Sequence, residues 1–256
     1  MNSELTQVEG NDNLSRYAEM FDRKQFQSLR EEITFAEYIN RCLKNPRLCR
    51  SAYQMMYDMI IAQGTKVKEI HRKNYTHYNF FDDPEMPIYG IEKTLHELVQ
   101  FFRGAAGWYG PERRFLLLHG PVGSSKSTIC RALKRGLEKY SASPEGAWYT
   151  FKWVNLPTGP EGIYTQSEDE CPMHEDPIKL MPTVIRNRLL DELNGILVDQ
   201  TPEDQRSSLY TLRCEGDLNP RCKKFLEELL RRNGGDWGLV MQKHVRVIRK
   251  VYSEPD

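Results

Sequence analysis

Residues 120–128, GPVGSSKST, carry the residue types that bind the phosphates of a nucleotide. The segment meets the pattern G-x-x-x-x-G-K-[ST] at Gly120, Lys126 and Ser127, although Ser125 stands where the second glycine is usual. In such a loop the backbone N–H groups converge on the phosphates, the lysine bridges the two outer phosphates, and the serine hydroxyl enters the Mg²⁺ shell. The sequence therefore predicts ATP and Mg²⁺ as cofactors. The predicted nucleotide-binding residues are Gly120, Pro121, Val122, Gly123, Ser124, Ser125, Lys126, Ser127 and Thr128, with Ser127 as the Mg²⁺ ligand.

Two flanking elements must position this loop. The apolar run at residues 115–118, FLLL, predicts a strand buried on both faces of a parallel sheet, and residues 128–140 predict the helix that follows. A strand before the loop and a helix after it favour phosphate binding over the alternative, which is a tight turn with a surface lysine. Ser125 should adopt a backbone conformation of higher steric cost than glycine would, with Gly123 taking part of the strain.

An enzyme of this class also needs a carboxylate on a neighbouring strand, which holds Mg²⁺ through water and polarises the attacking water. Two segments have sequences that could supply such a carboxylate. Asp191 and Glu192 follow two leucines, but the apolar residues around them recur at helical spacing, so a solvated helix face is the favoured interpretation. Asp199 ends the run ILVD, which could be a short strand.

A structural zinc site is the second candidate. Thiolate and imidazole groups suit Zn²⁺, which takes four such ligands in a tetrahedron. Cys171 and His174 form a Cys-x-x-His pair, and Cys214 and Cys222 follow about forty residues later. Asn219 stands where a cysteine would complete a tighter second pair. We weigh this site evenly against the alternative of reduced, partly buried thiols and a surface histidine.

Elsewhere, hydrophobic periodicity predicts mainly helices. Three are expected between residues 15 and 64, the second with a capping box at Thr34 and Glu37 and the third ending near Gly64. Residues 65–89 are polar and rich in turn residues, which predicts a linker and a domain boundary. Further helices are expected at residues 90–103 and 221–232, and a second core strand at residues 149–154, followed by a poorly packed insertion at about 157–217.

Composition limits the classes of partner. The 36 basic and 36 acidic side chains cancel, so no global field draws the chain to nucleic acid or an anionic membrane, and any such contact must be local. We therefore expect no nucleic-acid or membrane partner. The polar, acidic N-terminus and the lack of a long apolar run predict a cytoplasmic protein with its six cysteines reduced.

The segments PIYGIEKTLHELVQFFRGAAG and RFLLLHGPVGSSKS resemble the PrkA-type serine protein kinases, whose N-terminal part is an AAA+ ATPase module. The resemblance extends to CPMHEDPIKLMP, LRCEGDLNPRC and HVRVIRKVYSE, and so covers nearly the whole chain after about residue 15. Family members are much longer, so the chain looks like the N-terminal portion of such a protein. The resemblance also implies that Tyr89 and Gly90 lie near the adenine.

These observations predict an α/β fold, a P-loop NTPase of the AAA+ kind, with a parallel sheet flanked by helices. The expected domains are a helical N-terminal region with its linker, residues 1–81, and a PrkA-type AAA+ domain, residues 82–256. By resemblance the whole protein uses ATP to phosphorylate serine in a protein substrate. The alternative is an AAA+ component that remodels or degrades protein, and a homo-oligomer is the AAA+ expectation in either case.

Overall fold

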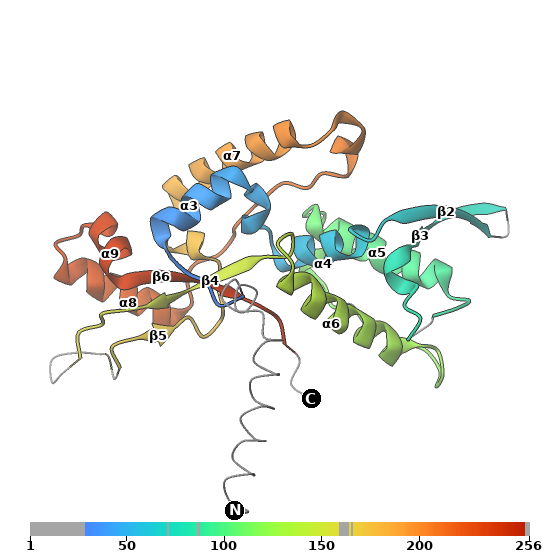
Figure 1. The fold of residues 1–256 in the computed structure, drawn as a ribbon, viewed down its shortest axis with the longest axis horizontal. Coiled ribbons are helices and arrows are strands. Elements are labelled where there is room, and N and C mark those ends of the chain that lie inside the picture. The colour runs from blue at the N-terminus through green and yellow to red at the C-terminus, as the bar shows by residue number, and fades with distance from the viewer. Residues whose placement is uncertain (1–28, 71, 86–87, 159–163, 165, 254–256) are drawn as a thin grey trace, which may run out of the picture. The chain divides into compact units, whose positions relative to one another are not determined.

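A computed structural model describes residues 29–70, 72–85, 88–158, 164 and 166–253 (Figure 1). The chain divides into two compact units, Met1–Glu31 and Glu32–Asp256, and the account below concerns the second unit. The helix expected near Tyr17 lies outside the described residues. None of the described helices is long and apolar enough to cross a membrane.

A four-stranded antiparallel sheet lies at one end of this unit, with the strand order β1-β6-β4-β5 (Figure 1). Its strands are β1 (Glu32–Thr34), β4 (Trp148–Trp153), β5 (Asp169–Glu170) and β6 (Val245–Lys250). The central pair, β4 and β6, runs in register from Trp148 opposite Lys250 to Trp153 opposite Val245. Aromatic and β-branched residues fill the core side of this pair, which explains why these segments pair as strands.

The predicted parallel sheet is not confirmed. The strand expected at residues 149–154 exists as β4, but its neighbours run antiparallel to it. Residues 115–119 form no strand; Phe115 is fully exposed and Leu117 is 81% exposed. A strand needs neighbours for its backbone N–H and C=O groups, and in the described part of the chain no strand pairs with this apolar run. The prediction of a buried strand here was therefore wrong for this chain.

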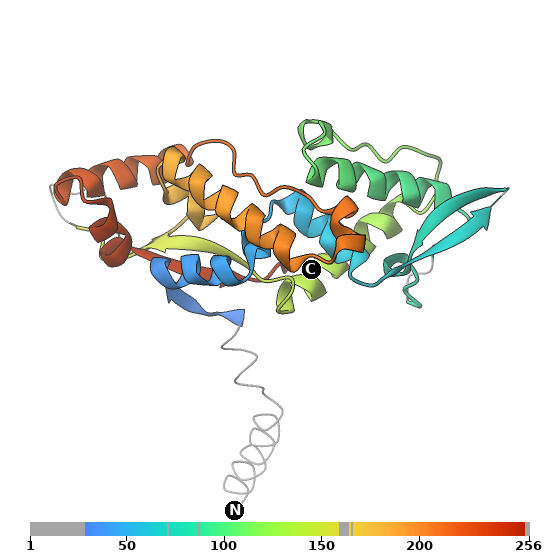
Figure 2. The same ribbon diagram turned by 90° about the horizontal axis from the view of Figure 1, so that it is seen from above.

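Four of the described helices pack against the sheet or against one another at this end of the unit (Figures 1 and 2). They are α3 (Phe35–Lys44), α7 (Thr183–Gln200), α8 (Pro220–Arg232) and α9 (Trp237–His244). The predicted capping box begins α3, since the Glu37 backbone N–H donates to Thr34 Oγ1 at 3.2 Å and the Thr34 backbone N–H donates to the Glu37 carboxylate at 2.8 Å. Helix α8 confirms the prediction for residues 221–232, whereas α9 was not expected.

The other helices of the unit are α4 (Ala52–Ile61), α5 (Glu92–Ala106) and α6 (Lys126–Ala142), which pack through α4 (Figure 2). Helices α4, α5 and α6 confirm predicted elements to within a few residues. The segment expected to be a linker instead holds a hairpin of β2 (Thr65–Ile70) and β3 (Lys73–Tyr78). Short 3₁₀ turns connect the elements: η1 (Pro46–Cys49), η2 (Asn79–Phe81), η3 (Pro111–Arg113), η4 (Pro177–Leu180) and η5 (Glu203–Ser208).

The segment expected to be a poorly packed insertion belongs to the core. Helix α7 contributes buried leucines at positions 189, 190, 193 and 197, and the 3₁₀ turn η4 buries Ile178 and Leu180. Sequence reasoning missed this because the apolar residues are separated by charged and turn-forming ones, although their spacing on α7 is helical. The described part of this segment is thus integral to the fold.

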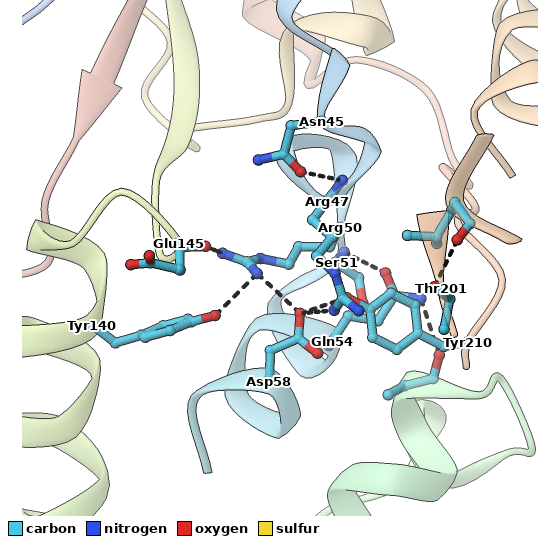
Figure 3. Close-up of polar contacts among 12 residues, drawn as sticks. Asn45, Arg47, Arg50, Ser51, Gln54, Asp58, Tyr140, Glu145, Thr201 and Tyr210 are labelled. Atoms are coloured by element: carbon cyan, nitrogen blue, oxygen red, sulfur yellow. Dashed lines mark hydrogen bonds and ion pairs between the residues drawn. The ribbon is translucent and has the colours of Figure 1, made fainter. Parts of the chain in front are cut away.

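A buried ion-pair network joins the elements around α4 (Figure 3). The Asp58 carboxylate accepts from Arg50 Nη1 at 2.9 Å, from Arg47 Nη1 at 3.0 Å and from the Tyr210 hydroxyl at 2.5 Å. Arg50 also donates to the Tyr140 hydroxyl at 3.2 Å and to the backbone carbonyl of Glu145 at 2.6 Å. One guanidinium thereby ties η1 and α4 to the C-terminal end of α6.

We expect Arg50→Met to lower the free energy of unfolding by about 3 kcal/mol, because it leaves a buried carboxylate with one charged partner fewer. The Arg50 side chain is only 3% exposed, so solvent cannot replace the lost donor. Urea denaturation followed by circular dichroism measures the change. Arg231→Met, which removes an exposed guanidinium from Glu228, is the control and should change stability by less than about 1 kcal/mol. Equal effects of the two substitutions would contradict this account.

Candidate functional site

The phosphate-binding pattern lies immediately before α6 and has the backbone of a strained turn. Gly123 has φ +82°, and Ser125, which caps α6, has φ +58° and ψ +14°. Both residues thus lie in the left-handed backbone region, in which glycine is unstrained and serine is not. The expectation of a steric cost at Ser125 is thus confirmed, while Gly123 adopts the same region without strain. The turn directs the chain so that the N-terminus of a 17-residue helix points at the loop.

The ammonium group of Lys126 lies inside the turn. Its Nζ donates to the carbonyl oxygens of Gly120 at 2.8 Å and Pro121 at 2.6 Å, and to Ser124 Oγ at 2.9 Å. The Ser124 hydroxyl in turn donates to the Pro121 carbonyl at 2.9 Å. The loop therefore holds its cation in place with three neutral oxygens, and anionic phosphate oxygens would be stronger acceptors for the same ammonium.

The loop is accessible, while the helix behind it is anchored. Residues 121–123 and Ser127 are exposed, so the Ser127 hydroxyl is open to a metal ion at the helix N-terminus. Ile129 and Ala132 are buried one turn further on. At Gly136 the helix touches the Phe80 ring so closely that an added Cβ would lie 2.4 Å from it. Sequence reasoning missed the role of Gly136, because a single glycine within a helical pattern carries no packing signal.

The Tyr89–Gly90 pair precedes α5. Tyr89 is 82% exposed, and Gly90 has φ +75°, a turn conformation that favours glycine. An exposed aromatic ring next to a sharp turn can stack on a base, but the proposed place near an adenine stays a prediction.

The acidic candidates all lie on α7. Asp191 and Glu192 are exposed on this helix, which confirms the preferred interpretation of a solvated face. Asp199 is also exposed near the C-terminal end of α7, so the alternative of a strand at residues 196–199 was wrong. The reason is that the helical pattern of α7 continues through Asn194-Gly195, which sequence reasoning treated as a break.

The predicted zinc ligands Cys171, His174, Cys214 and Cys222 do not come together as a set of four. In the part of the chain that the structure describes, no group of three or more His, Cys, Asp or Glu residues is arranged to hold a metal ion. His174 turns outward and pairs with the Glu170 carboxylate at 3.0 Å. Burial raises the pKa of the Cys214 thiol to about 12, which disfavours the thiolate that zinc requires. The zinc prediction is therefore corrected.

Cys171 and Cys222 do meet as hydrogen-bonded thiols. A hydrogen bond from the Cys222 thiol is the main reason that the pKa of the Cys171 thiol is lowered to about 7. Asn219 Nδ2 lies 3.5 Å from Cys171 Sγ and 2.7 Å from the Glu175 carboxylate. An amide thus occupies the position beside the thiol pair where a further ligand would be needed, in agreement with the place of Asn219 in the sequence, where a cysteine would complete a tighter pair.

Comparison with known proteins gives three findings. The family model of the PrkA AAA domain matches residues 33–236. The ATP-dependent protease PrkA of Bacillus subtilis (strain 168) is 33% identical over 207 residues, which cover 80% of this chain and 26% of that protein. An uncharacterized protein in the gldA 5' region of Geobacillus stearothermophilus is 34% identical over 86 residues, covering 33% of this chain and 80% of that protein. No solved structure matches with significance.

The buried Asp176 predicts a pH dependence of stability. Its Oδ1 accepts from the Tyr38 hydroxyl at 3.0 Å and from the Ile178 backbone N–H at 2.9 Å, yet burial raises the pKa of the carboxyl to about 6. The folded protein therefore binds this proton more tightly than the unfolded chain does. The resulting stabilisation is full below the unfolded pKa of about 3.9 and is lost as the pH rises through the folded value.

Asp176→Asn keeps an oxygen acceptor but cannot titrate. Relative to wild type, its free energy of unfolding should be higher at about pH 7.5 than at about pH 4.5, as measured by urea denaturation. Asp199→Asn, on an exposed position of α7, is the control and should show the same pH profile as wild type. A parallel shift of Asp176→Asn at both pH values would contradict the expectation.

The left-handed conformation of Ser125 predicts that Ser125→Gly is more stable than Ser125→Ala by about 1 kcal/mol, because only the alanine keeps a Cβ. Both substitutions remove the same hydroxyl, which makes no capping hydrogen bond to α6. Thermal unfolding of the two variants measures the difference. If the two melt at the same temperature, the backbone at this position is not strained.

Proposed function

Because the chain belongs to the PrkA AAA domain family, we propose that it is the ATP-binding module of a protein-acting ATPase, with the nucleotide on the loop before α6. The observation that carries the proposal is the position of Lys126, whose ammonium group lies among loop oxygens at the N-terminus of a long helix. A helix N-terminus and a clustered cation favour a polyanion, and the triphosphate of ATP is the ligand that this motif binds.

In this proposal each part of the loop has one task. The backbone N–H groups of residues 122–125 would cradle the phosphates, Lys126 would move from the loop carbonyls to the β- and γ-phosphate oxygens, and the Ser127 hydroxyl would ligate Mg²⁺. When bound, Mg²⁺ neutralises charge on the phosphates. Tyr89 and Gly90 supply the adenine contact. The strained turn at Ser125 is formed before the nucleotide binds, so less ordering accompanies binding.

The activity of the whole protein is a separate proposal, since the chain spans 26% of the length of the Bacillus subtilis relative. The leading hypothesis is ATP-dependent phosphorylation of serine in a protein substrate. The name of that relative, an ATP-dependent protease, favours a second hypothesis in which ATP drives protein degradation. Either activity takes a protein as substrate, and a homo-oligomer and a cytoplasmic location are part of the same proposal.

We expect Lys126→Ala to weaken Mg²⁺-ATP binding about 100-fold, because it removes charge-assisted bonds worth about 3 kcal/mol together. Equilibrium binding of a fluorescent ATP analogue measures the loss. Lys139→Ala, an exposed lysine near the other end of α6, is the matched control and should bind like wild type. Circular dichroism should show an intact fold in both. Unchanged affinity of Lys126→Ala would remove the nucleotide assignment.

One assay separates the two activities of the whole protein. Full-length protein incubated with casein and ATP labelled in the γ-phosphate should yield phosphoserine in intact casein if it is a kinase. Peptide fragments without label would identify a protease instead. Lys126→Ala of the same full-length protein should abolish either product, and a product that persists in it would show that the loop does not drive the reaction.

A further inference from the structure

The β2–β3 hairpin separates its side chains into two unlike faces. Residues paired across an antiparallel ribbon share a face, and successive residues along a strand alternate. The register pairs Lys66 with His77 and Lys68 with Tyr75 on one face, while Val67 pairs with Thr76 on the other. The described side chains of the first face are thus basic or aromatic, whereas the second face carries the pairs Thr65–Tyr78, Val67–Thr76 and Glu69–Asn74.

The basic face is open to solvent. Lys66 and Lys68 are exposed, and Val67 between them is 73% exposed on the opposite face. His77 lies on the same face and contacts Lys68 Nζ at 3.3 Å through its Nε2. The neighbouring acid is Asp82, whose carboxylate lies 2.9 Å from His77 Nε2. One carboxylate cannot neutralise two lysines, so the face keeps a positive charge although the whole chain is neutral.

Strand β2 also has an unpaired edge. In the described sheet of two strands, β3 packs against α5, with the Tyr78 ring stacked on His96 at 6.4 Å. Every residue from Thr65 to Glu69 on β2 is exposed. Alternate residues of β2 must therefore direct backbone N–H and C=O groups away from β3 and toward solvent. An open strand edge of this kind is a template for another extended chain.

We propose that this edge of β2 binds an extended, acidic polypeptide segment as a third strand. Carboxylates at alternate positions of the segment would lie on the face of Lys66 and Lys68, within the distance of a cross-strand pair. Small or β-branched residues between them would cover Val67 on the opposite face. The backbone bonds supply affinity, and the two lysines select acidic sequences.

The charge pattern argues against two other occupants. A second copy of the hairpin, paired with its basic face on the same side, would bring lysines opposite lysines, a repulsive arrangement that disfavours self-association of the edge. Nucleic acid would engage the lysines but would leave the polar backbone edge of β2 and the exposed Val67 unused. A polypeptide uses all three features at once.

The inference names a class of partner for the proposed function and rests on it for its physiological meaning, because an ATPase that acts on protein must hold a polypeptide. Binding at the hairpin needs no nucleotide. Lys126→Ala should therefore retain peptide binding even though it loses ATP. Failure of the nucleotide proposal would thus appear in the ATP-binding assay, and failure of the hairpin proposal would appear in the peptide-binding assay.

The test uses fluorescence anisotropy of the whole chain with a fluorescein-labelled peptide, Glu-Thr-Glu-Val-Glu-Thr-Glu. We expect binding that weakens with salt, and the combined substitution Lys66→Glu and Lys68→Glu should reduce the affinity roughly tenfold, because two attractive cross-strand pairs become repulsive. Lys139→Glu with Lys224→Glu makes the same change in net charge at exposed sites on other elements and should bind within about twofold of wild type.

A second peptide separates strand addition from simple charge attraction. The same sequence with alternate backbone N-methyl groups keeps every carboxylate but cannot donate hydrogen bonds to β2. It should therefore fail to bind the wild-type protein, and this result does not depend on the folding of any variant. Equal binding of the methylated and unmethylated peptides would overturn the proposal. Tighter binding of a single-stranded oligonucleotide through the same two lysines, or no peptide binding at all, would also overturn it.

Discussion

The described unit depends on one buried charge. Asp58 lies on α4 with its carboxylate removed from water, a state that is costly unless strong donors surround it. Two guanidinium groups, both from η1 and its C-terminal cap, and the distant Tyr210 hydroxyl meet on one of its oxygens. Burial, and next to it the charge of the same carboxylate, raises the pKa of Tyr210, whose hydroxyl then stays a proton donor. Burying this charge therefore requires η1, α4 and the segment around Tyr210 to assemble together.

Arg50 extends this constraint to the candidate nucleotide site. It holds the C-terminal end of α6 through Tyr140 and Glu145, while Gly136 sits against Phe80 in the middle of the helix. The N-terminal end, which carries the loop, is anchored by the buried Ile129 and Ala132. The helix is thus a fixed support, and the loop keeps its own shape through the strained turn and Lys126. Under the proposed function, phosphate binding would change the hydrogen-bond partners of Lys126 while the helix keeps its place.

Local signals in the sequence predicted the local structure well. The capping box at Thr34, the helix after Lys126 and the strain at Ser125 each follow from a few adjacent residues, and the structure confirms them. Pairing between distant segments could not be predicted in this way. The apolar run at residues 115–118 has the composition of a buried strand, but composition does not state which segment would pair with it. The zinc prediction failed for the same reason, because only the fold places Asn219 beside Cys171.

The hairpin shows why net charge is a poor guide to partners. The chain is neutral overall, yet the antiparallel register places Lys66 and Lys68 together on an exposed face. This hairpin packs on α5, α5 packs on α4, and α4 packs on the helix that carries the loop. A polypeptide on the hairpin and a nucleotide on the loop would therefore act on one continuous set of packed helices. Arg50 lies where α4 meets α6, and Phe80, two residues after β3, touches α6 at Gly136, so two contacts join the hairpin side of the unit to the helix that carries the loop.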